Sequence, residues 1–192
     1  MASQSNVFLT PDEYLDLEGK AEYKSEYMDG EMFAMAGVSR AHDTLAINLI
    51  ALLHSEFKGT PCRVYSSDMR VAVSPTSVYT YPDLSIACQD AQFIGRGTDN
   101  LLNPVAIIEI LSPSTEGYDR GKKFQRYQEI ESLQEYVLVS QDRVLMERYI
   151  RQPNGEWLYS SASGLTDSVR LVSAPATIQL AVVYDGVFPP DK

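Results

Sequence analysis

The sequence predicts a fold of the α/β or α+β class, in which helices flank a central mixed β-sheet. Three observations support this prediction. Apolar residues recur at helical spacing over about residues 41–57. The segment VAIIEIL, residues 105–111, is almost wholly apolar, which is typical of a central strand buried on both faces. Segments with helix and strand patterns also follow one another in the order helix, sheet, helix, sheet.

A short helix and a hairpin come first. Thr10, Pro11 and Glu13 supply a capping hydroxyl, a proline in the first turn and a glutamate three residues after the cap, which together form a capping box. Residues 24–37 hold two half-apolar runs joined by Asp29-Gly30. An Asp-Gly pair between such runs predicts a β-hairpin.

An amphipathic helix follows over about Ala41–Phe57, with Gly59 and Pro61 after its end. Its leucines, at helical spacing, are Leu45, Leu49, Leu52 and Leu53. Short β-branched segments, separated by Pro, Gly, Ser and Asp, then predict four strands. These strands are Arg63–Tyr65, Arg70–Val73, Asp83–Ala87 and Val105–Leu111.

The rest of the chain predicts a second helix and further strands. The helix covers about Asp119–Glu131 and carries its apolar stripe at Phe124, Tyr127 and Ile130. The strands that we expect after it are Tyr136–Ser140, Val144–Ile150 and Trp157–Ser160, followed by a β-rich tail over Val169–Val187.

Length and composition are typical of a cytoplasmic globular protein. The 192 residues fit one domain, residues 1–192, with a core over about 8–187. We expect no secretory signal and no membrane-spanning segment. Two cysteines, Cys62 and Cys88, are too few for a structural zinc site or a disulfide framework, so we expect both to be reduced thiols.

The net charge is −10, from 16 Lys and Arg against 26 Asp and Glu. This balance argues against a nucleic-acid footprint spread over the whole surface. It leaves room for a local basic patch beside an acidic metal site, because metal-binding carboxylates count as negative until cations fill them.

Several catalytic classes lack their motifs. The sequence has no G-x-x-x-x-G-K-[ST] phosphate loop, no G-x-S-x-G nucleophile elbow and no H-E-x-x-H zinc motif. With only His42 and His54, a histidine-rich metal site is not expected. We favour a surface position for His42, in the first turn of its helix, and a structural role for His54.

Glu109 needs a partner, because it is a lone charge in VAIIEIL and an unpaired buried charge is expensive. Two interpretations are open. Glu109 and Asp83, which opens a neighbouring strand, can bind a divalent cation, since hard cations prefer carboxylate and carbonyl oxygens. Alternatively, Glu109 pairs with a buried cation such as Arg70 or Lys123.

The helix that begins in YDRGKKFQR favours the cation site. Lys123 adjoins the apolar stripe and can therefore reach the sheet. Lys122 and Arg126 lie four residues apart on a different face of this helix, from which they can contact phosphates. For Lys122, a position on a solvated face is the simpler interpretation. Two carboxylates, a metal ion and a lysine can hydrolyse a phosphodiester: the metal polarises the phosphoryl oxygen, and the lysine orients water or stabilises developing charge.

At this point the sequence resembles a known family, the restriction-endonuclease-like domains of the PD-(D/E)XK nuclease superfamily. Single motifs of this kind are weak, but six in the family's order are specific. The matching segments are EYMDGE (26–31), SSDMRVAV (66–73), YPDLSI (81–86), IEILSPST (108–115), DRGKKFQRY (119–127) and EYVLV (135–139).

The resemblance implies a restriction-endonuclease-like core with Asp83 as the PD aspartate and Glu109 as the acidic residue of (D/E)XK. Both would bind Mg²⁺ or Mn²⁺, with the carbonyl of Ile110 as a further oxygen ligand. Glu26 matches an acidic position that often completes such sites.

The sequence departs from the motif at one place. The motif lysine should follow Glu109 by two residues, where this chain has Leu111. The resemblance maps the lysine onto Lys123 of the following helix, from which it can reach the same water.

The leading hypothesis is a metal-dependent endonuclease that acts on DNA as a homodimer, with Asp83, Glu109, Lys123 and Glu26 in the site. The DNA would contact Arg120, Lys122 and Arg126. Because cations are few, binding should depend only weakly on salt, as expected for a handful of phosphate contacts. A catalytically silent dimeric module and a small-molecule phosphoesterase on the same scaffold remain alternatives.

Overall fold

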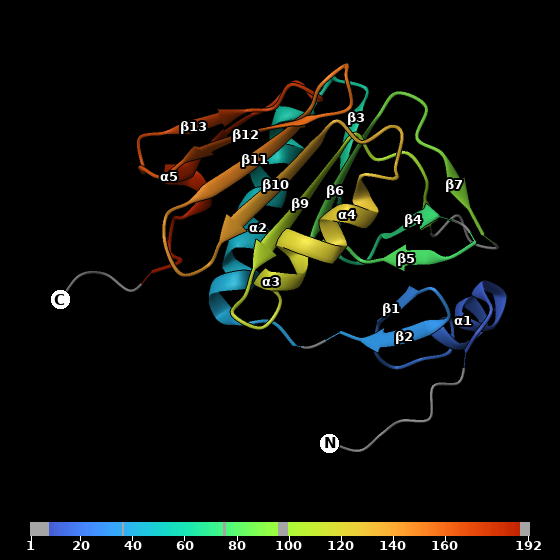
Figure 1. Cartoon of the computed structure of the whole chain (residues 1–192). Coiled ribbons are helices and arrows are strands. Elements are labelled where there is room, and N and C mark those ends of the chain that lie inside the picture. Colours follow the sequence, from blue (N-terminus) through green and yellow to red (C-terminus); the bar gives the residue numbers. More distant parts are fainter. Residues whose placement is uncertain (1–7, 36, 75, 96–99, 189–192) are drawn as a thin grey trace.

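The computed structural model describes residues 8–35, 37–74, 76–95 and 100–188. Within these residues, two six-stranded sheets are packed with helices, and a separate two-stranded sheet lies beside the second of them (Figure 1). The helices are α1 (Pro11–Glu18), α2 (Arg40–Glu56), α3 (Glu116–Tyr118), the π-helical segment η1 (Asp119–Lys123), α4 (Phe124–Tyr127) and α5 (Leu180–Val183). The strands are β1 (Ser25–Met28), β2 (Glu31–Ala34), β3 (Cys62–Ser66), β4 (Arg70–Ser74), β5 (Val78–Thr80), β6 (Leu84–Cys88), β7 (Phe93–Ile94), β8 (Asn100–Leu101), β9 (Ala106–Leu111), β10 (Glu135–Ser140), β11 (Met146–Arg151), β12 (Trp157–Ala162), β13 (Ser168–Arg170) and β14 (Thr177–Gln179).

The predicted fold class is confirmed, but the strands form two large sheets instead of one. The first sheet has the order β2-β1-β5-β4-β8-β7, and the second sheet has the order β12-β11-β10-β9-β6-β3. Each sheet is mixed, because β4 runs parallel to β8 and β9 runs parallel to β10 while the other pairs are antiparallel. The predicted order of strands along the chain did not reveal this division, which depends on long-range pairing.

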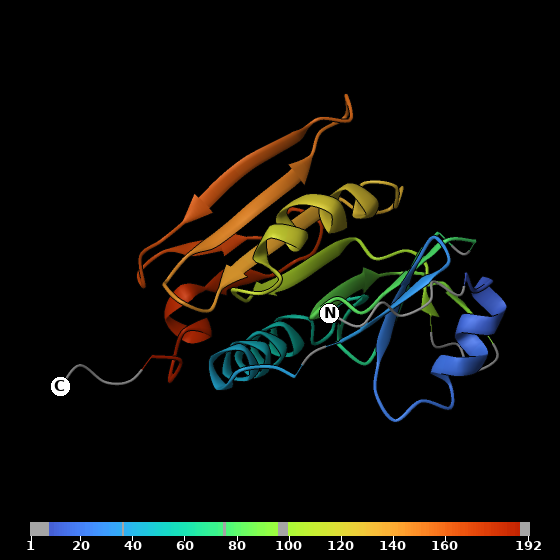
Figure 2. The ribbon, with the colours of Figure 1, turned by 60° about the horizontal axis from the view of Figure 1, so that its bottom comes forward.

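Local signals at the N-terminal end worked as predicted. Thr10 and Glu13 form the capping box of α1. The hairpin β1–β2 turns at Asp29 and Gly30, both with positive φ, 49° and 98°. This conformation suits the Asp-Gly pair, because two-residue hairpin turns need left-handed backbone. Figure 2 shows α1 and this hairpin at the opposite end of the molecule from the C-terminal strands.

The second sheet is covered on both faces, by α2 behind it and by α3 and α4 in front of it (Figure 1). Because side chains alternate along a strand, β9 presents Ala106, Ile108 and Ile110 to the core on the α2 side. Its Ile107 and Leu111 join the core on the α3–α4 side. Glu109 belongs by alternation to this second face, so its carboxylate lies between the sheet and the segment 116–127.

The predicted helix over residues 119–131 is wrong in its form and its bounds. Helical structure begins earlier, at Glu116, passes through the π-helical turn η1 and ends at Tyr127. A π-turn shifts the residues after it relative to those before it, and such turns are frequent at functional sites. The predicted apolar stripe is buried nonetheless, since Phe124, Tyr127 and Ile130 are all in the core.

The cysteine prediction is also wrong. Cys62 and Cys88 form a disulfide, with their Cα atoms 3.9 Å apart. The reason is the antiparallel register of β3 and β6, which places these two residues directly opposite each other although 26 positions separate them in sequence. Nothing local to either cysteine reveals that pairing.

The predicted β-rich tail is only partly correct. Its two short strands, β13 and β14, pair with each other, and the segment then forms the one-turn helix α5. Leu180 and Val183 of that helix pack with α2 in the core behind the second sheet. Of the helices in the described ranges, none is long and apolar enough to cross a membrane.

Candidate active site

Two carboxylates meet where β6 begins and β9 ends. Leu84 of β6 pairs with Ile108 of β9 in antiparallel register, so the preceding Asp83 comes opposite Glu109. The backbone N–H of Asp83 donates to Glu109 Oε2 at 3.3 Å, and the N–H of Ile110 donates to Asp83 Oδ2 at 2.7 Å. The structure therefore brings together the two acids that the sequence singled out.

Lys123 supplies the ammonium at this point. Its Nζ lies 2.9 Å from Glu109 Oε1 and 3.2 Å from Glu26 Oε1. The lysine is 6 % exposed and projects from η1 onto the face of β9 that α3 and α4 cover. Leu111, at the position of the motif lysine, is buried in the apolar core instead. The ammonium therefore reaches the carboxylates from the helical segment and not from the strand.

The alternative partner for Glu109, Arg70, is not used. Its Nε donates to Asn100 Oδ1 at 2.6 Å, and its guanidinium lies over the rings of Tyr14 and Tyr81. Of the two predicted ion pairs for Glu109, only the one with Lys123 is present within the described residues.

Glu26 faces the same cluster from the first sheet. It lies on β1, is 7 % exposed, and accepts a hydrogen bond of 3.1 Å from the backbone N–H of Tyr81. Tyr81 comes directly before the Pro82-Asp83 pair, so the backbone that carries Asp83 also anchors Glu26. This contact links β1 of the first sheet to the segment that leads into β6 of the second sheet.

Two further members of the cluster were not predicted. Asp119 is buried, and its Oδ1 lies 3.8 Å from Lys123 Nζ. Tyr127 donates from its hydroxyl to Glu109 Oε1 at 2.8 Å, the same oxygen that Lys123 contacts. Their spacing of four residues before and after Lys123 was the available signal, because residues four apart share a helix face.

His42 is not the surface residue that we predicted. It is 9 % exposed, and its Nε2 lies 3.1 Å from Asp83 Oδ2. The helical spacing offered a signal, since His42 precedes Leu45 and Leu49 by three and seven residues and thus falls on the buried stripe of α2. His54 is exposed, so the structural role that we predicted for it is also wrong.

Carboxylates outnumber cations in this cluster. Burial raises the pKa of Glu109, and although Lys123 opposes that shift, the nearby Asp83, Asp119 and Glu26 add to it. Burial alone would lower the pKa of Lys123, but Glu109, Glu26 and Asp119 together raise it well above its ordinary value. The site is thus an ammonium among acids, with an excess of negative charge that attracts a proton or a cation.

Access to the cluster comes from two sides. Asp83 and His42 line a hollow of about 430 Å³ against the first turns of α2. Glu26 lines a groove of about 890 Å³ between the hairpin β1–β2 and the segment 114–129. Lys123 and Glu109 lie deeper, with their side chains 7 % and 3 % exposed.

The three predicted DNA-contacting cations have different surroundings. Arg120 binds Glu116 and Glu147. Arg126 binds Asp29 and Glu129. Lys122 is exposed, lines the groove beside Glu26 and makes no ion pair with any residue that the structure describes. Only Lys122 therefore presents a charge that is not already balanced by a carboxylate.

The donor set is compatible with magnesium or manganese. Within the described ranges, no three His, Cys, Asp or Glu side chains are grouped so as to hold a metal ion by themselves. Mg²⁺ needs fewer protein ligands than that, because it commonly binds through one or two carboxylates and keeps several waters. The opposed carboxylates of Asp83 and Glu109 meet this requirement.

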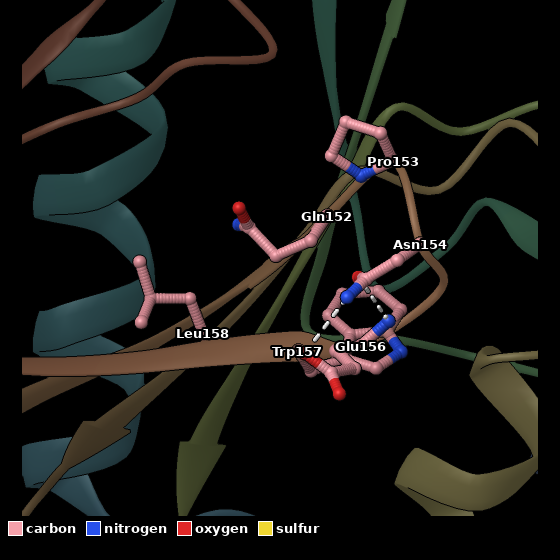
Figure 3. A pocket seen from close by; sticks show the side chains of 6 residues that line it. All are labelled: Gln152, Pro153, Asn154, Glu156, Trp157 and Leu158. Carbon is pink, nitrogen blue, oxygen red and sulfur yellow. Dashed lines mark hydrogen bonds between the residues drawn. The ribbon is translucent and has the colours of Figure 1, made fainter.

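A separate hollow of about 430 Å³ lies at the turn between β11 and β12 (Figure 3). Asn154 spans this turn, since its side chain donates to Glu156 Oε2 at 2.9 Å and accepts from the Glu156 N–H at 3.1 Å. Glu156 is the one ionisable residue among those lining it, so this hollow lacks the paired charges that hydrolytic chemistry needs.

Comparison with known proteins identifies the family of this chain. Residues 11–183 match the model of the Uma2 family, which is described as "Putative restriction endonuclease". The chain belongs to the Uma2 family. Two relatives from Synechocystis sp., "Uncharacterized protein slr1290" and "Uncharacterized protein sll1609", are 35% and 34% identical. The alignments cover 93% and 85% of this chain, and 93% of each relative.

A solved structure has the same fold. It is described as a putative nuclease belonging to DUF820 from Anabaena variabilis, and it superposes with a TM-score of 0.77 over 94% of this chain and 99% of that one. The sequences are 19% identical, so this likeness shows the fold alone. The resemblance to restriction-endonuclease-like domains is confirmed for this Uma2 chain at the level of family and fold.

Proposed function

We propose that this chain is a Mg²⁺- or Mn²⁺-dependent nuclease that hydrolyses phosphodiester bonds of DNA. The observation that carries the proposal is the convergence of Asp83, Glu109 and Lys123, with Lys123 Nζ 2.9 Å from Glu109 Oε1. Membership of a family described as "Putative restriction endonuclease" supports it.

The carboxylates of Asp83 and Glu109 would hold the metal ion. When bound, the ion supplies Lewis acidity toward a phosphoryl oxygen and favours ionisation of water. In the reaction, a water oxygen forms a bond to phosphorus as the water gives up a proton to solvent. The bond from phosphorus to the leaving sugar oxygen breaks, and that oxygen takes up a proton from solvent. Side chains of the protein would position the substrate and stabilise the charge that develops on it.

Lys123 is the group best able to stabilise charge on the phosphoryl oxygens. Its ammonium is buried among Glu109, Glu26 and Asp119, and hydrogen bonds to charged groups are strong at such dry positions. To reach a substrate, Lys123 would exchange one of these carboxylates for a phosphate oxygen or a water. Glu26 lines the groove through which a substrate would approach, so it is the carboxylate that Lys123 would release most readily.

His42 acts as a positioning residue in this proposal. Its Nε2 and the N–H of Ile110 both contact Asp83 Oδ2 and so fix the direction of that carboxylate. Exchange of His42 for Asn keeps a hydrogen-bonding side chain, whereas exchange for Ala removes it. We expect His42→Ala to weaken Mn²⁺ binding about ten-fold and His42→Asn to restore part of the loss.

The test is nicking of supercoiled plasmid with Mg²⁺ or Mn²⁺, by the wild type and by Asp83→Asn. The proposal expects nicking by the wild type that falls at least 100-fold in the variant. Activity that is absent, or that survives the substitution, contradicts it. Lys58→Gln, an exposed change outside the cluster, is the matched control for preparation and folding.

A second candidate is a catalytically silent dimeric module on the same scaffold. It is favoured by the ion pairs that already occupy Lys123, Arg120 and Arg126, and by Leu111 at the motif position. This candidate predicts a folded dimer that neither binds Mn²⁺ nor nicks plasmid. Calorimetric titration with Mn²⁺ combined with the nicking assay separates the two, because both candidates are dimers.

A further inference from the structure

The groove beside Glu26 differs from a surface built for double-stranded DNA. The hairpin β1–β2 forms one wall and the segment from Ser114 to Glu129 forms the other. Its volume of about 890 Å³ is in the range of pockets that hold one compact ligand, about 300–1,000 Å³. We infer that this groove binds an unpaired stretch of DNA, with a base stacked on Phe33. The inference rests on the proposed function and specifies its substrate.

Phe33 is placed beside the candidate site by strand register. It is the direct cross-strand partner of Glu26 on β1, and directly opposed residues point to the same face with Cβ atoms about 4.5–5.5 Å apart. Phe33 is 48 % exposed, while its partner Glu26 is buried and contacts Lys123. A base on this ring would therefore lie next to the ammonium and carboxylates.

Other aromatic groups complete an apolar floor. Phe8, 71 % exposed, lies against Gly30 at the hairpin turn, so closely that a side chain at Gly30 would collide with the ring. Tyr118 reaches across from α3, and its hydroxyl lies 2.7 Å from the sulfur of Met28 on β1. Exposed aromatic side chains such as Phe8 and Phe33 stack on unpaired bases regardless of base identity. In an intact duplex the faces of the bases are covered by their neighbours.

Carboxylates outnumber cations along the groove, where Glu26, Asp29, Glu31 and Glu129 stand against Lys122 and Arg126. Arg126 is held between Asp29 on the hairpin and Glu129 after α4. Lys122 is exposed, lines the groove and makes no ion pair within the described part of the chain, so it can bind one phosphate. With one such lysine, electrostatic attraction contributes little, and stacking must supply most of the affinity. A long duplex, which needs many phosphate contacts, fits this surface poorly.

The experiment measures fluorescence anisotropy of labelled oligonucleotides of equal length, single-stranded and duplex, with EDTA present so that no cleavage occurs. We expect the wild type to bind the single strand at least ten-fold more tightly than the duplex. Phe33→Leu should weaken single-strand binding about ten-fold, in line with the loss of one stacked base. Tyr23→Leu, at an exposed ring that does not line the groove, should leave it unchanged.

Salt dependence tests the second contact. Lys122→Gln should reduce the slope of log K against log salt by about one, whereas Lys20→Gln, also exposed, should not alter it. Equal or tighter binding of duplex, or an unchanged affinity of Phe33→Leu for the single strand, overturns the inference. So does a wild-type dimer, seen by sedimentation velocity, that Phe33→Leu converts to a monomer, because the groove would then hold a second copy.

Failure of this inference can be told apart from failure of the nuclease proposal. Plasmid nicking that depends on Asp83 but not on Phe33 keeps the nuclease and removes the stacking groove. Phe33-dependent binding of single strands without Mn²⁺-dependent cleavage keeps the groove and removes the nuclease.

Discussion

The two faces of strand β9 use the same backbone for opposite purposes. On the α2 side, Ala106, Ile108 and Ile110 are buried among apolar side chains and carry no charge. On the α3–α4 side, Glu109 stands between Ile107 and Leu111 and meets Lys123. Burial of apolar side chains on the first face stabilises the fold. On the second face, the removal of charged groups from water lowers that stability. A site of this kind needs a strong apolar face behind it.

Lys123→Met is the change with the largest expected effect. It removes the ammonium but leaves Glu109, Glu26 and Asp119 buried, so the free energy of unfolding should fall by about 3–5 kcal/mol. Urea denaturation followed by circular dichroism measures this. Lys122→Met, at the exposed neighbour, should change it by less than about 0.5 kcal/mol. Equal effects of the two substitutions would show that Lys123 is not paired as described.

Leu49→Ala tests the apolar face of β9, which packs against α2. Leu49 lies on α2, is 0 % exposed and packs against the apolar side of the second sheet. The free energy of unfolding should fall by about 2–5 kcal/mol. The Mn²⁺ affinity of the folded fraction should stay as in the wild type, measured by calorimetry under conditions where the variant is folded. A loss of Mn²⁺ binding in folded Leu49→Ala would show that the two faces are not separable.

Glu147→Gln tests an ion pair at the edge of the charged face, on β11, where we expect the pair to contribute less than the buried pairs of Lys123 do. Burial alone would raise the pKa of Glu147, but hydrogen bonds from Arg120 and Tyr159 hold it below its ordinary value of 4.5. A carboxylate with a depressed pKa stabilises the fold above that ordinary value, and the contribution is lost as the pH falls through the pKa of the folded state. We expect Glu147→Gln to cost about 1 kcal/mol at pH 7, because the pair is partly screened by solvent.

The measurement for Glu147 is a series of urea denaturations between pH 7 and pH 3. The difference between wild type and variant should shrink as the pH falls below about 4.5. A difference that stays constant over this range would mean that the charge of Glu147 contributes nothing. Glu156→Gln, at an exposed carboxylate in the β11–β12 turn, is the matched control.

Features set by local pattern were predictable from the sequence. The helix expected over 41–57 was observed at 40–56, and the hairpin turned at Asp29-Gly30, because periodicity and turn chemistry act within a few residues. The chemical need of Glu109 for a partner was also visible, since a lone charge stands out in an apolar strand. In each case the physical cause and its signal lie in the same short segment.

Features set by long-range pairing were not predictable. The contact of His42 with Asp83 joins residues 41 apart, and the disulfide joins Cys62 to Cys88 through strand register. The division into two sheets and the π-turn before Lys123 likewise depend on how distant segments pack. Single residues whose role arises only from such packing give little sign of it in sequence.

Calorimetric titration with Mn²⁺ tests most directly the claim that Asp83 and Glu109 form a cation site. The wild type should bind one Mn²⁺ per chain, and Asp83→Asn and Glu109→Gln should each weaken binding at least ten-fold, while the control Glu156→Gln should bind as the wild type does. Absence of binding by the wild type, or binding that both substitutions leave unchanged, would contradict the account.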